Sequence, residues 1–385
     1  MLDKTFARIS LIAAALAVIA AWQLSTAPAA FGEEPKVMTE AEMKTEFLKL
    51  CDIQGKIVYN QPESAGTGRK KTRTFYWDSY VVRALCVAYD MTGKKEYLDT
   101  CKKWSDLMIG YQKDMIPAGA YYMQYYRKPG EKEGWWYAAD CSSIAMGVLA
   151  TAVRCDDPVE KKKYLDSVKA FAKLVNENFV RPSGGVTDGY WAKSKDEWWC
   201  STGIFGSLSF LLYKETGDEQ YLKVGLGALD WLNKQDWKTM DVFYEKIVND
   251  PTIIAYCLEG YSPAFPYLEP GSERYKATMV KWDFALTWMK ENFGGAGGRE
   301  YVSQWGSKMG YSPFHMYRYA HNVPNSEEFI KIADKELTYA KGVLDKTPAT
   351  NPKRNQVALF MMMSYAERLS PGAMYRSSKE KPADK

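Results

Sequence analysis

The chain has 385 residues, of which 46% are hydrophobic and 25% are charged. These proportions are typical of a globular protein that is long enough to bury a large core. The net charge of +4 is small for this length, so the charge does not imply a nucleic-acid partner.

Residues 1–30 have the features of a bacterial secretory signal peptide. Lys4 and Arg8 give a basic start, residues 9–22 are an apolar run, and Ala27-Pro-Ala29 offers small residues for cleavage. The run is shorter than the roughly 20 residues that a membrane span needs, although an uncleaved anchor is the alternative. We therefore expect a secreted or periplasmic protein that is not stably inserted in a membrane after cleavage.

Seven cysteines follow this segment, and none belongs to a C-x-x-C pair. An odd number leaves at least one thiol unpaired in a monomer, and most are expected to be small core residues. One or two disulfides are possible in an oxidising compartment, but the sequence does not give their pairing.

Five turns recur along the chain, each followed by charged residues and then by an aromatic residue that begins a new apolar pattern. The aromatic residues of the last three turns, Tyr221, Tyr275 and Phe329, are 54 residues apart. A fixed period of this size indicates repeated supersecondary units. The turns lie at 90–100, 154–167, 214–224, 268–278 and 321–332.

Each turn joins two helices of different kinds. The helix before the turn is apolar or small on all sides, as at 80–91, 142–153 and 201–213, which is typical of a buried helix. The helix after the turn has a polar stripe, which is typical of a helix that faces water. With one helix near 39–51 and a last one near 353–369, about twelve helices are expected.

Alternating buried and exposed helices predict an all-α fold, an (α/α)6 toroid of about six hairpins with an inner and an outer ring. An open solenoid of helix pairs is the alternative, but its repeats are usually shorter, at roughly 34–47 residues. The toroid is expected over residues 31–370, and residues 371–385 are expected to form a disordered polar tail.

The links from each outer helix to the next inner helix are long, as at 112–137 and 179–197, and long ordered loops usually carry function. Because all inner helices of such a ring run the same way, these loops and the helix starts should meet on one rim. The segments expected there are 72–80, 134–143, 188–202 and 299–317.

Aromatic residues gather in these segments, and the apolar faces of sugar rings stack on Trp and Tyr. The alternative is that tryptophans near helix starts only cover the core. The residues predicted to bind a sugar by stacking are Trp77, Trp136, Trp191, Trp199 and Tyr311.

Two carboxylates near one site can divide acid and base work, because each raises the proton affinity of the other. Asp78 and Asp140 begin consecutive inner helices and should be neighbours on the rim. The alternative for Asp140 is an N-cap, a position that Asp fills well. Glu197 and Glu259 are weaker candidates. The two histidines, six residues apart, do not share a helix face, so a zinc pair is not expected.

Three stretches together resemble the six-hairpin glycosidases, and among them the unsaturated glucuronyl and unsaturated rhamnogalacturonyl hydrolases. They are YWDSYVVRALCVAYDMTGKKEYL at 76–98, AADCSSIAMGVLATAV at 138–153, and YWAKSKDEWWCSTGIFGSLSFLLYKETGDEQYL at 190–222, within a likeness that spans about 40–370. The third stretch is similar to a W-A-R-G-x-x-W loop of the family. Lys193 stands there in place of the usual Arg, and the glycine is absent.

The resemblance implies a secreted hydrolase of oligosaccharides that end in a 4,5-unsaturated uronic acid, with no metal or organic cofactor. Asp140 would be the general acid and base that protonates the double bond and helps to activate water, and Asp78 would be the second acid. A cation such as Arg73 or Lys193 would hold the substrate carboxylate, and Tyr311 and His315 would add substrate contacts.

Two other classes of function stay open. The first is a polysaccharide lyase or uronyl epimerase on the same fold, with a Tyr or His315 as its base. The second is a non-catalytic glycan-binding protein, which the altered third stretch keeps possible. The polysaccharide, its linkage and the oligomeric state are not determined by the sequence.

Overall fold

A computed structural model describes residues 36–60, 74–123, 132–191, 195–239, 251–293, 310–348 and 352–381. The elements below belong to one compact unit, Val37–Lys385. The described residues contain twelve α-helices and no named strand, with isolated β-bridges in loops, such as that between Ile116 and Glu133.

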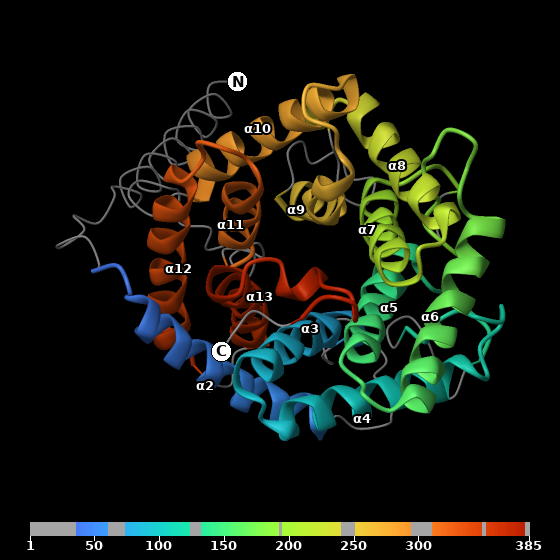
Figure 1. Ribbon diagram of the computed structural model, residues 1–385, viewed down its shortest axis with the longest axis horizontal. Helices are drawn as coiled ribbons and strands as arrows, with labels where there is room; N and C mark the ends of the chain where they lie inside the picture. The colour runs from blue at the N-terminus through green and yellow to red at the C-terminus, as the bar shows by residue number, and fades with distance from the viewer. Residues whose placement is uncertain are drawn as a thin grey trace, which may run out of the picture. The chain divides into compact units, whose positions relative to one another are not determined.

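The helices alternate along the chain between an outer and an inner ring (Figure 1). The outer helices are α2 (Glu40–Tyr59), α4 (Lys95–Gln112), α6 (Pro158–Asn178), α8 (Glu219–Lys234), α10 (Glu273–Phe293) and α12 (Glu328–Lys346). The inner helices are α3 (Phe75–Thr92), α5 (Ala138–Val153), α7 (Trp199–Thr216), α9 (Pro251–Tyr261), α11 (Ser312–Asn322) and α13 (Pro352–Leu369). Short 3₁₀ turns lie at η1 (Trp237–Thr239), η2 (Ser262–Tyr267) and η4 (Ala373–Tyr375).

The ring is closed, because α13 packs against both α2 and α3 (Figure 1). The amide of Gln54 on α2 donates a hydrogen bond to Asn355 on α13, over 3.3 Å between Nε2 and Oδ1. The first and last hairpins therefore meet, which an open solenoid does not allow. The prediction of an (α/α)6 toroid is confirmed.

The two kinds of helix bury different surfaces, as their sequences require. The inner helix α5 is buried along its whole length except at Ala139 and Asp140. The outer helix α8 buries one stripe, which includes Tyr221, Ala228 and Leu232, and turns its polar residues to water. None of the described helices combines the length and the apolar composition that a membrane span requires.

Small residues let neighbouring inner helices approach closely. A Cβ atom added to Gly260 on α9 would lie 2.5 Å from the carbonyl oxygen of Gly203 on α7. A Cβ atom on Gly203 would in turn lie 2.8 Å from the carbonyl oxygen of Tyr256. The two helices thus touch backbone to backbone, which keeps the inner ring narrow.

Residues 371–381, called the C-terminal strap below, run from α13 past the ends of α3, α5 and α7 (Figure 1). The strap contains the 3₁₀ turn η4, in which Tyr375 is buried. The expectation of a disordered tail is therefore wrong for these residues. Residues 382–385 lie outside the described part of the chain.

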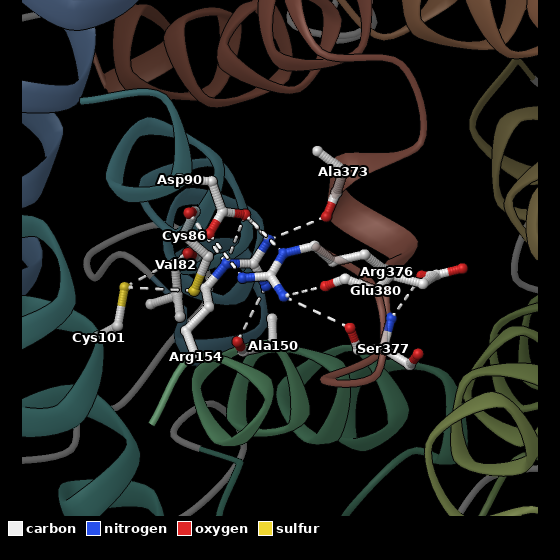
Figure 2. A network of polar contacts seen from close by, with 10 residues as sticks. All are labelled: Val82, Cys86, Asp90, Cys101, Ala150, Arg154, Ala373, Arg376, Ser377 and Glu380. Atoms are coloured by element: carbon white, nitrogen blue, oxygen red, sulfur yellow. Dashed lines mark hydrogen bonds and ion pairs between the residues drawn. The ribbon is translucent and has the colours of Figure 1, made fainter. Parts of the chain in front are cut away.

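The strap is held by charges at the ends of the inner helices, as Figure 2 shows for Asp90 and Arg154. Arg376 donates to both carboxylate oxygens of Asp90, over 2.7 and 2.9 Å. Arg154 donates to the same carboxylate over 2.6 Å and to the carbonyl oxygen of Ala373 over 2.9 Å. Ser378 donates from its backbone nitrogen and hydroxyl to Glu215 on α7, over 2.8 and 2.6 Å. The polar residues of the strap therefore pair with charged residues at the ends of the inner helices, and their polarity does not indicate a solvent-exposed tail.

We expect Arg376→Gln to lower the free energy of unfolding by about 2 kcal/mol, because it removes two hydrogen bonds to a buried carboxylate. Urea unfolding of the full chain measures this. Lys162→Gln is the control, since the ion pair of Lys162 with Asp166 is exposed to water on both sides and is worth little. Equal stability of the two variants would show that the strap does not contribute to the fold.

Candidate active site

Asp140 lies in the first turn of α5, on the rim where the inner helices begin. The residue before the helix, Tyr137, is the N-cap and has an extended backbone, so Asp140 is the third helical residue. The alternative interpretation of Asp140 as an N-cap is therefore wrong. The helix dipole favours a negative charge at this position, and burial of the rest of α5 leaves this first turn as the part of the helix that solvent can reach.

Two loops that are distant in sequence hold the start of α5. The backbone nitrogen of Ala138 donates to the carbonyl oxygen of Asp188 over 2.6 Å, and that of Trp136 donates to Tyr190 over 3.2 Å. Gly189 permits this approach: its φ is 135°, and a Cβ atom there would lie 2.5 Å from the carbonyl oxygen of Trp136. The loops before α5 and α7 thus form one support for Asp140.

Partly exposed aromatic side chains surround this turn. Trp135 and Tyr137 contact each other edge to face, with ring centroids 6.5 Å apart. Trp199, the first residue of α7, is fixed by an edge contact with Trp231 at 5.6 Å. Such rings present apolar surface together with a polar edge, as a sugar-binding surface requires. The half-buried aromatic residues of this region are Trp77, Trp135, Tyr137, Tyr190, Trp199 and Tyr256.

Tyr256 on α9 is a site residue that the sequence analysis missed. Burial raises the pKa of its hydroxyl well above the ordinary value, and the neighbouring Tyr76 and Tyr80 raise it further. The charge of Asp140 also raises the pKa of Tyr256. No local motif marks Tyr256, because α9 lies two places beyond α5 in the inner ring, with α7 between them.

A buried group of four side chains, called the cross-ring cluster below, joins α3 to α9. Arg83 donates from Nη1 to Oε1 of Glu259 over 2.6 Å. Tyr80 donates to Oε2 of Glu259 over 3.1 Å, and Tyr311, just before α11, donates to the same oxygen. All four side chains are at most 1% exposed. Burial, and next to it the charge of Glu259, raise the pKa values of both tyrosines well above their ordinary range.

The cross-ring cluster spans the ring. The inner helices follow one another in the order α3, α5, α7, α9, α11, α13, so α3 and α9 face each other across the ring (Figure 1). The ion pair of 2.6 Å between Arg83 and Glu259 therefore joins two inner helices across the ring.

Asp78 lies on the neighbouring inner helix α3 and is fully buried. The register of α3 against α5 is given by Ser79, whose Cβ atom would be 3.1 Å from a Cβ atom on Gly147. Asp78 therefore lies level with Met146, about 9 Å further down α5 than Asp140, at roughly 1.5 Å per residue. The structure places both acids toward the same end of the ring, with Asp78 the deeper one. Their mutual influence stays a prediction.

Trp136, predicted to stack on substrate, is instead a core residue. It is 0% exposed, and its ring contacts Phe171 and Phe179 edge to face. The reason is the extended backbone before α5, in which successive side chains point to opposite sides. Trp135 and Tyr137 are therefore turned to the rim and Trp136 to the core.

His315 and Tyr311 are also in the core rather than at the surface of the site. His315 is 0% exposed and lies against Tyr311 and Trp282, with ring centroids 4.6 and 6.2 Å away. Burial and, after it, the charge of Arg318 lower the pKa of His315 to about 3, so the imidazole is neutral at physiological pH. Neither residue can touch a ligand on the rim without a rearrangement of the core.

The other predicted residues fall in different places. Trp77 and Trp199 are on the rim and partly exposed, and Trp191 is 52% exposed with a positive φ of 58°. Glu197 accepts hydrogen bonds from Trp231, over 2.7 Å, and from Ser183, so it holds a loop. Arg73 and Lys193 lie outside the described residues. Within those residues, no three side chains of the metal-ligating types come together.

No family model matches the sequence, and no curated protein matches it. Three solved structures are similar over most of their length. An unsaturated glucuronyl hydrolase specific for heparin has 10% identity and a TM-score of 0.60, covering 86% of this chain and 97% of its own. An inactive variant of the α-1,6-mannanase GH76A of Salegentibacter sp. HEL1_6, in complex with α-1,6-mannotetrose, has 13% identity and a TM-score of 0.61, covering 85% and 99%. A sugar epimerase from a ruminal bacterium has 13% identity and a TM-score of 0.59, covering 85% and 99%.

The chain has the six-hairpin glycosidase fold. The similarity spans nearly the whole of each neighbour and about six sevenths of this chain, so it concerns the complete ring. The resemblance inferred from the three sequence stretches is confirmed at the level of the fold.

We expect Glu259→Gln to lower the free energy of unfolding by about 3–5 kcal/mol, because it leaves the Arg83 guanidinium buried without its counter-charge. The double variant with Arg83→Met should be less destabilised than the sum of the two single variants. Urea unfolding of all three variants measures the coupling, and strictly additive effects would contradict an ion pair across the ring.

The pH dependence of stability should reflect two buried groups. Burial raises the pKa of Glu336 from 4.5 to about 8, so folding is weakened as pH rises through that window. The pKa of His315 is lowered from 6.5 to about 3, so this residue makes the free energy of unfolding rise with pH between those values. The two slopes, each about 1.4 kcal/mol per pH unit, cancel between pH 4.5 and 6.5.

From this cancellation we expect stability to fall between pH 6.5 and 8, by about 2 kcal/mol. Glu336→Gln should flatten this range, and unfolding in urea at half-unit pH steps measures it. A variant that keeps the wild-type slope above pH 6.5 would mean that another group causes the loss.

Proposed function

We propose that this protein is a carbohydrate-active hydrolase that removes a 4,5-unsaturated uronic acid from the end of an oligosaccharide. The observation that carries the proposal is the position of Asp140. It is the acid in the open first turn of an otherwise buried inner helix, among partly exposed aromatic rings.

The proposed chemistry needs one group that gives and takes a proton. The Asp140 carboxyl protonates the carbon–carbon double bond of the unsaturated sugar and then helps to deprotonate the water that adds to it. The hydrated sugar opens its ring and releases the rest of the oligosaccharide. Trp77 and Trp199 would stack on the sugar, and the Tyr256 hydroxyl would bind next to the reacting carbons.

The position of adjacent aspartates supports this reaction over that of the mannanase. The inactive mannanase variant has two adjacent aspartates replaced. In this chain the adjacent aspartates are Asp156 and Asp157, and Asp157 is the N-cap of the outer helix α6, away from the rim of Asp140. Asp140 follows Ala139, so the start of α5 offers a single acid.

A uronyl epimerase or lyase is the second candidate, and the electrostatic interaction of Tyr256 with Asp140 favours it over the binding-protein alternative. In that case Tyr256 would be the base. His315 is not suited to this role, since it is buried and neutral. For either enzyme, we propose that residues 1–30 direct export to the periplasm or beyond, where polysaccharide fragments are found.

The test is to incubate the chain with a panel of unsaturated disaccharides made by polysaccharide lyases and to follow the ultraviolet absorbance of the double bond. We expect the absorbance to fall with the wild-type protein on at least one disaccharide. A rise in absorbance on intact polysaccharide would indicate a lyase instead, and an inverted uronate without any change in absorbance would indicate an epimerase.

We expect Asp140→Asn to reduce turnover by about 100- to 10,000-fold, because an amide cannot shuttle the proton. Its melting temperature and sugar affinity should stay close to those of the wild type, since size and shape are kept. Asp157→Asn is the matched control, because Asn caps a helix about as well as Asp and this residue lies away from the site. Full activity in Asp140→Asn would refute the catalytic role.

A further inference from the structure

Two buried cysteines face each other inside the hairpin made of α3 and α4. Cys86 on the inner helix and Cys101 on the outer helix have their sulfur atoms 3.7 Å apart (Figure 2). Both side chains are 0% exposed, and the two helices pack along each other. The sulfurs are thus in van der Waals contact with no atom between them.

The surroundings make the two thiols unequal. Burial raises the pKa of Cys86, but the contact with Cys101 and the positive charge of Arg154 outweigh it, so the net pKa lies below the ordinary value. Burial, together with Cys86, raises the pKa of Cys101 well above its ordinary value. Arg154 is fixed in this position, because its Nε donates to the carbonyl oxygen of Cys86 over 3.0 Å. Cys86 is therefore the thiol of the pair that ionises more readily.

We propose that Cys86 and Cys101 are a dithiol–disulfide pair that links the inner helix α3 to the outer helix α4. A disulfide needs the sulfurs to approach to about 2.05 Å, and they already lie 3.7 Å apart. The oxidant is a small-molecule disulfide such as oxidised glutathione. The sequence left the pairing of the seven cysteines open, and this contact selects one pair.

The exchange has two steps. Local opening of the hairpin first exposes Cys86. Its thiolate attacks one sulfur of oxidised glutathione, and the other leaves as a thiolate that takes up the proton released by Cys86. The Cys101 thiolate then attacks the sulfur of Cys86, and the second glutathione leaves with the proton of Cys101. In total, two protein thiols are oxidised to one disulfide and one molecule of oxidised glutathione is reduced to two thiols.

The link would join an inner helix that carries buried charges to the outer helix α4. Helix α3 also bears Asp78, Arg83 and Asp90, and Asp90 holds the strap one turn after Cys86. A disulfide between Cys86 and Cys101 closes the loop between them and so reduces the conformational freedom of the unfolded chain. For a protein of this size, the gain in stability corresponds to a rise in melting temperature of about 4 °C.

The experiment treats the purified full chain with oxidised or reduced glutathione, blocks remaining thiols with an alkylating agent in denaturant, and maps the peptides without reduction. We expect the peptides of Cys86 and Cys101 to be joined after oxidation, and the melting temperature to rise by about 4 °C. Free, alkylated Cys86 and Cys101 after oxidation, or either one joined to a different cysteine, would overturn the proposal.

Cysteine variants provide a second measurement, which does not depend on the recovery of peptides. Cys86→Ser and Cys101→Ser should each abolish the shift in melting temperature between oxidised and reduced samples. Cys257→Ser on α9 should keep it, because Cys257 is equally buried and burial alone accounts for its raised pKa. A shift that survives Cys86→Ser, or disappears in Cys257→Ser, would show that a different pair is oxidised.

Discussion

The ion pair between Arg83 and Glu259 is the contact on which the geometry of the ring depends. It joins two inner helices that lie opposite each other and whose residues are 176 positions apart in the sequence. A buried ion pair is weak evidence for stability, because desolvation of both charges offsets much of their attraction. Its effect here is geometric: it sets the distance across the ring, and the hydroxyls of Tyr80 and Tyr311 complete the coordination of the carboxylate.

Further polar contacts join the inner helices beside this pair. Arg318 donates to Glu367 over 3.1 Å and to the carbonyl oxygen of Ser262 over 2.7 Å, and Tyr375 of the strap lies against Arg318. Hydrogen bonds and ion pairs therefore join the inner helices at more than one level of the ring interior. Asp140 lies in the first turn of α5, whereas Glu259 lies near the end of α9.

The sequence predicts the fold well, because the composition of each helix indicates whether that helix is buried. Uninterrupted apolar composition in α5 and α7 and a polar stripe in α8 are local signals, and the ring follows from their alternation. The position of Asp140 is equally local, since it marks the start of a buried helix. The prediction that Trp136 stacks on a sugar was wrong, because successive side chains of an extended segment point to opposite sides. Tyr256 and the Arg83–Glu259 pair were missed because they depend on closure of the ring, which no short stretch encodes.

The strap also has a consequence for the order in which the protein is completed. Asp90 and Arg376 are 286 residues apart, so a ribosome finishes α3 well before it reaches the strap. At about 5–20 residues per second, this interval lasts roughly 15–60 s. During that time the end of α3 is without this partner. Asp90 and Glu215 are therefore carboxylates whose partners in the strap are synthesised 286 and 163 residues after them.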